Sequence, residues 1–381
     1  MSATGTTFGS GRRSAVREFG SAVLTIMTKE LRSRMRGRRA FIILTAYLGV
    51  LALITYGVYV TVAPFVLENA GQVGQGTSQA NASRSIGQWI FSVLSIFQII
   101  LVSMMAPAFT AGQISLEREK QTLDLLISTP MRPGAIVIGK LVTALAFVVL
   151  MVVAAIPITA IVLMYGGASV GDIVRQQILL LSVAIGFGAI GLFASALMRR
   201  TQAATVVAYG AVLALTLGTA MTYTFWTELA TRDQGFVIGA RPAAPEQLRW
   251  VNPMIGMLDI VAGVEIDGPT RFTAPLYQLF GEDLAVSGAG FDCGNFGCGR
   301  GLEPVPDPAL DVLLPSPTGD HWWPRVALTF LAIAGVLTIA SMRLVVPPGM
   351  RWALRRRRPA RFDAATVEAA PLIEELGEAE R

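Results

Sequence analysis

The chain has 381 residues, of which 53% are hydrophobic and only 15% are charged, with a net charge of +5. Soluble globular domains carry about 25% charged residues, so the composition excludes an ordinary soluble protein. The apolar residues gather in blocks, each long enough for the ~20 residues that cross a bilayer as a helix. The sequence therefore predicts an integral membrane protein.

The N-terminal segment, residues 1–39, is rich in arginine and precedes the first apolar block. Between Val16 and Leu31 the apolar residues fall on one helical face and the basic residues on the other, which predicts an amphipathic helix at the membrane interface. An alternative is that the arginines only set the topology. The first apolar block has no cleavage pattern after it, so we expect a retained helix and no cleaved signal peptide.

Six apolar blocks follow one another along the chain. Backbone polar groups inside a bilayer must be satisfied within the segment, and the blocks lack the alternation of barrel strands. The predicted fold is therefore an all-α integral membrane protein with six transmembrane helices. The expected spans are Ala40–Ala63, Gln88–Gly112, Leu141–Tyr165, Ile173–Met198, Ala203–Phe225 and Val326–Leu344.

The distribution of Lys and Arg predicts the orientation of the chain. Arginines cluster before the first span, at Arg199 and Arg200, and at Arg355–Arg358 after the sixth span. Loops rich in these residues stay in the cytoplasm, so both termini are expected there. Residues 40–225 then hold spans one to five, residues 326–344 the sixth span, and residues 345–381 a C-terminal tail that contacts anionic lipid.

Residues 226–325 separate the fifth and sixth spans and are rich in proline and glycine. A segment of this length without regular elements predicts a small, irregular extracytoplasmic subdomain. It holds both cysteines, Cys293 and Cys298, which we expect to form a disulfide outside the cell. A metal site is the alternative, but two thiolates fall short of four ligands. His321 is interpreted as a surface residue.

The helix centres hold no ionisable residue of the kind that binds a coupling ion. Gln98 is among the few strongly polar residues at depth and is interpreted as a contact between helices. These centres also carry no Asp, Glu, His or Cys for catalysis, so we expect no catalytic, metal-binding or cofactor-binding residue. Work done by this protein must then draw on an external source of energy.

Two glycine motifs resemble nucleotide sites but lack the required context. Gly134, Gly139 and Lys140 match a phosphate loop, yet Leu141 follows where Ser or Thr is needed and no strand precedes. A second motif, the GFGAIG of residues 186–191, matches a dinucleotide fingerprint but lies inside the fourth span. Its small residues are interpreted as sites of close helix packing.

The densest cluster of mixed charge, Glu117 to Lys120, follows the second span. We expect it to continue a helix until Thr129-Pro130, because a residue before proline is pushed out of the α region. Arg132-Pro133 then starts the next helix. Residues 114–140 are therefore predicted to form a charged cytoplasmic hairpin. An alternative is that the charges merely end the second helix in water.

This stretch, SLEREKQTLDLLISTPMRPGAIVIGKL, resembles the signature of the type-2 permease family of ABC transporters. The resemblance extends to TKELRSRMRGRRAF before the first span and to the six-helix layout, but not to residues 226–325. Gln121 stands where many relatives have glycine, and we expect it to tighten the local helix.

The resemblance implies a noncatalytic permease subunit, in a multi-pass arrangement in the inner (cytoplasmic) membrane, that pairs with a separate ABC ATP-binding subunit. The permeases are expected to form a homodimer or heterodimer among membrane lipids, without nucleic acid. The implied function is ATP-driven export. An alternative is a mechanotransmitting subunit that acts on an extracytoplasmic partner without a translocated substrate. The residues expected to contact the ATPase are Glu117, Arg118, Glu119, Thr122, Leu123, Leu126, Thr129 and Pro130.

Overall fold

The computed structural model describes residues 38–72, 79–121, 133–233, 246–264, 273, 275–276, 291–292, 299–300 and 322–345. The amphipathic helix predicted at 16–31, the two cysteines, His321 and the tail beyond Val345 lie outside these residues. Within them the chain is helical, apart from a short antiparallel pairing of β1 (Phe291–Asp292) with β2 (Gly299–Arg300).

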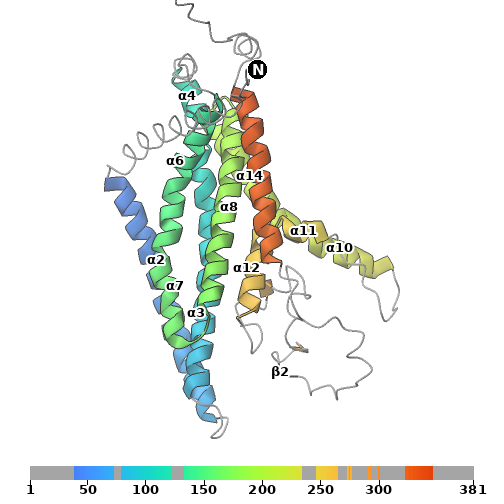
Figure 1. The fold of residues 1–381 in the computed structure, drawn as a ribbon. Coiled ribbons are helices and arrows are strands. Elements are labelled where there is room, and N and C mark those ends of the chain that lie inside the picture. The colour runs from blue at the N-terminus through green and yellow to red at the C-terminus, as the bar shows by residue number, and fades with distance from the viewer. Residues whose placement is uncertain are drawn as a thin grey trace, which may run out of the picture.

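Six helical spans in the described part of the chain are long and apolar enough to cross a membrane, which confirms the predicted number. Figure 1 shows them as a bundle with α4 at one end. The helices that build the spans, with the short helix α4 after the second, are α2 (Arg38–Gln72), α3 (Gln79–Thr110), α4 (Ser115–Glu119), α6 (Pro133–Ala154), α7 (Ile156–Tyr165), α8 (Val170–Leu197), α9 (Thr201–Leu213), η1 (Ala214–Gly218), α10 (Thr219–Asp233) and α14 (Trp323–Val345).

Two of the spans are interrupted. The third breaks between α6 and α7, where Pro157 lacks an N–H and cannot continue the hydrogen-bond ladder. The fifth contains the π-helical turn η1 between α9 and α10. The side-chain amide of Asn252 donates to the carbonyl of Thr216 at 3.0 Å, so a group outside the span satisfies a carbonyl of the widened turn.

The central helix of the bundle is α8, which packs against α3, α6, α9 and α14. A methyl group at Gly186 would overlap Phe330 of α14, one at Gly188 would overlap Leu145 of α6, and one at Gly191 would overlap α3. These three glycines therefore let three helices approach α8 closely. The interpretation of the GFGAIG motif as a packing feature is confirmed.

A buried pair of amides joins α3 to α8. The Nε2 atom of Gln176 donates to Oε1 of Gln98 at 2.8 Å, and both side chains are fully buried. A hydrogen bond between helices satisfies polar groups that lipid cannot. The prediction that Gln98 makes a contact between helices is confirmed, although Gln176 was not singled out as its partner.

The segment between the fifth and sixth spans differs from the expectation of a separate subdomain. Its helices α11 (Glu246–Trp250) and α12 (Pro253–Ala262) are described, and α12 packs against α3, α8 and α14. Figure 1 shows α12 beside α8, below the start of α14. Because α12 has only ten residues, it is too short to be recognised as a span from length and hydrophobicity.

The end of α12 also fixes the start of the sixth span. The carboxylate of Asp259 accepts a hydrogen bond from the backbone N–H of Trp323 at 3.0 Å, where α14 begins. A carboxylate at a helix N-terminus satisfies a donor that has no partner within the helix and interacts favourably with the helix dipole. Part of residues 226–325 therefore belongs to the helical bundle.

Candidate functional site

The candidate site is α4 together with the ends of the helices around it. The chain leaves α3 through a turn at residues 111–114 and enters α4 at Ser115. The hydroxyl of Ser195, near the end of α8, accepts from the backbone N–H of Ile114 at 2.9 Å and from that of Ser115 at 3.0 Å. Because all three residues are buried, this contact attaches the start of α4 to the central helix.

A buried ion pair attaches α4 to α6. Nζ of Lys140 lies 2.5 Å from Oε1 of Glu117 and also donates to the carbonyl of Gln113 at 3.2 Å. The Lys140 side chain is only 5% exposed, whereas that of Glu117 is 26% exposed. A buried ammonium is costly unless it is paired. The ion pair therefore holds the start of the third span against α4.

A third contact joins α4 to the start of α9. The Glu119 carboxylate accepts from the backbone N–H of Thr201 at 2.7 Å and from its hydroxyl at 2.6 Å. The residue at the cap position, Arg200, provides no side-chain cap of its own. The Glu119 side chain, which belongs to α4, therefore accepts the hydrogen bonds that the side chain of a capping residue next to α9 would normally accept. Both Glu119 and Arg200 are exposed.

The remaining charges of α4 are positive. Arg118 is half-buried and is repelled by Arg199, which lies just before α9. Lys120 is exposed, as is Leu116. Leu116 and Lys120 are four residues apart and share one face of α4, whereas Arg118 lies on another face, near Arg199.

Gln121 follows the end of α4 and has a left-handed backbone conformation, with φ of 56°. Its N–H donates to the carbonyl of Arg118 at 3.1 Å, as expected of a residue just after a helix end. The expectation that Gln121 tightens the helix is wrong, because the helix stops before it. Glycine adopts this conformation without the steric cost of a Cβ atom, so Gln121 stands at a position that favours glycine.

The structure describes three of the residues predicted to contact an ATPase, and it brings them together in α4. They are Glu117, Arg118 and Glu119. The other five residues, and the rest of the hairpin up to Pro133, lie outside the described residues: Thr122, Leu123, Leu126, Thr129 and Pro130. The carboxylates of Glu117 and Glu119 bind residues of this same chain, which the sequence did not suggest.

Three residues of the site were missed at the sequence level: Lys140, Ser195 and Thr201. Lys140 could have been found, because a lone charge at the start of a long apolar helix needs a partner. In the sequence Lys140 closes the predicted hairpin and completes the phosphate-loop motif. The structure places Gly134, Gly139 and Lys140 inside α6, where no phosphate loop can form. Ser195 and Thr201 carry no comparable signal.

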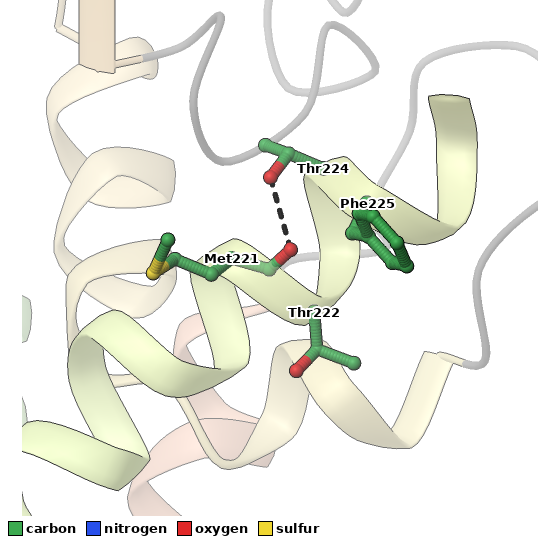
Figure 2. Close-up of a pocket in the computed structure, with 4 residues that line it drawn as sticks. All are labelled: Met221, Thr222, Thr224 and Phe225. Atoms are coloured by element: carbon green, nitrogen blue, oxygen red, sulfur yellow. Dashed lines mark hydrogen bonds between the residues drawn. The ribbon is translucent and has the colours of Figure 1, made fainter. Parts of the chain in front are cut away.

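Other features of the described residues do not form a second site. They contain no group of three or more His, Cys, Asp or Glu side chains that could hold a metal ion. A shallow hollow lies along α10, and Figure 2 shows the residues that line it. Thr224 donates there to the carbonyl of Met221. The described residues that line the hollow are Met221, Thr222, Thr224 and Phe225, and none of these four is charged.

A bundle of six apolar helical spans, with a charged helix held at one end by three of them, defines a multi-pass membrane protein. Residues 24–265 match the family model described as ABC-2 family transporter protein. The match covers more than half of the chain, and the chain belongs to this family of ABC transporter permeases. No curated protein sequence matches the chain.

The ion pair of Lys140 and Glu117 generates a stability prediction. Glu117→Gln should lower the free energy of unfolding by about 2–3 kcal/mol, because the buried ammonium loses its closest carboxylate. Lys140→Met should also destabilise the protein, and the double variant should recover most of the loss. Thermal unfolding of the purified chain in detergent measures this. Arg175→Gln, which breaks an exposed pair with Asp172, should cost less than about 1 kcal/mol. Equal losses in Glu117→Gln and Arg175→Gln would contradict the assignment.

The conformation of Gln121 generates a second prediction. Gln121→Gly should stabilise the protein by roughly 1 kcal/mol, because glycine adopts a positive φ without the steric cost of a Cβ atom. Gln121→Ala keeps the Cβ atom and should bring no comparable gain. The same thermal unfolding measurement compares the two variants, and an equal response would show that the left-handed conformation is not populated.

Proposed function

We propose that the chain is the permease subunit of an ATP-driven exporter in the inner membrane, with both termini cytoplasmic, and that a separate ABC ATP-binding subunit docks on its α4 end. Two permeases, identical or different, would pair with the ATP-binding subunits. The family supports a permease of an ABC transporter and, in general, a noncatalytic membrane subunit with such a partner. Docking at α4 extends this to particular residues.

One observation carries the proposal. α4 has only five residues, yet buried or charged contacts from Ser195 of α8, Lys140 of α6 and Thr201 of α9 hold it in place. A helix that merely ended the second span in water would need none of these contacts. A rigid element joined to three spans can pass a displacement at its surface into the bundle.

The contacts inside the chain also assign roles within the docking element. Glu117 and Glu119 use their carboxylates to place α4, so we assign them to positioning it. Arg118, with the exposed Leu116 and Lys120, is left to face the partner. The predicted docking residues beyond 121 would extend this surface: Thr122, Leu123, Leu126, Thr129 and Pro130. The expected partner surface carries carboxylates around an apolar depression.

A charge reversal at Arg118 tests the docking surface. Arg118→Glu should reduce co-purification of the cognate ATP-binding subunit, and the ATPase activity of the complex, by about tenfold or more, because a positive contact becomes repulsive. The matched control is Arg175→Glu, an exposed cation near the start of α8, at the other end of that helix from Ser195. That variant should assemble normally.

Two results would contradict the proposal. One is an Arg118→Glu variant, as stable as the unmodified chain, that still assembles fully with the ATP-binding subunit. The other is ATP hydrolysis by the purified chain alone, which would show that the permease is itself catalytic. The thermal unfolding measurement described above separates a docking defect from a folding defect.

A mechanotransmitting subunit is the second candidate function, and the position of α12 favours it. Because α12 packs in the bundle and Asp259 caps α14, a movement of the spans would reach the segment that joins them. In this case the chain would act on a partner on the far side of the membrane, without a substrate passing through the bundle.

A shortened variant distinguishes the two functions. Leu276 and Trp322 pack against the same apolar cluster, so a short linker can replace residues 277–321 without removing α12. As an exporter, the shortened chain should still restore the phenotype of a strain that lacks the gene. Loss of complementation, with assembly and ATPase activity intact, would favour the mechanotransmitter.

A further inference from the structure

The three attachments of α4 differ in how easily they can open. Those to α8 and α6 involve the buried Ser195 and Lys140 side chains. The attachment to α9 is exposed, since the Glu119 carboxylate and the start of α9 face solvent. Opening an exposed, water-accessible contact costs less than opening a buried one. Of the three attachments of α4, the one to α9 is therefore expected to open most easily.

The fully buried side chains of α9 are small, and further along the helix the hydroxyl of Tyr209 donates to the carbonyl of Met104 in α3 at 3.1 Å. The buried residues of α9 are Ala204, Ala208 and Val212. Ala208 packs with Ala111 and Ala194 in a small cluster of alanines. These small residues let α9 lie close to its neighbours but provide no directed polar contact. The contact between Glu119 and Thr201 therefore provides a directed polar attachment at the start of α9, eight residues before that of Tyr209.

The C-terminal end of α9 is where we expect a hinge in the fifth span. α9 runs into the π-helical turn η1, a feature that often occurs at functional sites. Asn252 at the start of α12 binds the carbonyl of Thr216 in this turn and the hydroxyl of Thr219. Beyond it, Figure 1 shows α10 extending away from the bundle. The fifth span is therefore anchored at η1 and linked to α4 at its start.

We propose that Glu119 is a positioning residue that couples α4 to the fifth span: it holds the start of α9 through Thr201, and its release lets α9 turn about η1. The inference rests on the proposed docking of an ATP-binding subunit at α4. Beyond that docking, it identifies the fifth span as the one that moves relative to the others and Glu119 as the side chain that controls the movement. Glu117 has the opposite role and keeps α6 fixed to α4.

Hydrogen exchange of the purified full-length chain tests the capping contact without any partner. In Glu119→Ala the amides of residues 201–206 should exchange about fivefold faster, the effect expected for losing a helix cap. Glu119→Gln keeps one acceptor oxygen and should have a smaller effect, as should Thr201→Val, which removes only the hydroxyl. Arg175→Gln is the matched control, because it breaks an ion pair with Asp172 at the far end of α8 from α4, and it should leave these amides unchanged.

Exchange in the complex with the ATP-binding subunit tests the coupling. Addition of a nonhydrolysable ATP analogue should change the exchange of residues 201–206 in the unmodified chain, and Glu119→Ala should abolish this response. Unchanged exchange in isolated Glu119→Ala, or an analogue response that persists in that variant, would overturn the inference. Failure of the unmodified chain to bind an ATP-binding subunit would instead overturn the proposed function. Hydrogen exchange of the isolated chain would still test the contact between Glu119 and Thr201 in that case.

Discussion

The close packing of α8 is the constraint on which the rest of the structure depends. Lipid offers no hydrophobic gain for bringing two helices together, so close contact must come from shape. Gly186, Gly188 and Gly191 remove the side chains that would keep α14, α6 and α3 away from α8. Once these helices surround α8, its end presents Ser195 to α4, and the start of α6 brings Lys140 to Glu117.

The two ends of the bundle use the same physical device. A carboxylate on a short helix caps the start of a long one: Glu119 of α4 caps α9, and Asp259 of α12 caps α14. Each cap joins residues far apart in the chain, 82 positions in the first case and 64 in the second. The short helices are therefore attached to the spans by directed polar contacts, and a force on either can reach a particular span.

The prediction from sequence succeeded where the signal is local. The six spans and the packing role of the glycine motif follow from residues close together in the chain, and the structure confirms both. It was incomplete at α12, whose ten residues fall below the length of a span. It was wrong at Gln121, because a left-handed helix end depends on where α4 stops and not on residue preference alone.

The sequence by itself determined that this is a six-span membrane protein of the ABC-2 transporter family, because hydrophobic length and a long signature can be read without knowing any contact. Only the tertiary structure decided what the charges of the signature do. Glu117 and Glu119 are two residues apart, yet one binds α6 and the other α9. Such partners depend on how the helices pack around α8, and side chains that meet across 23 or 82 positions leave no local pattern in the sequence.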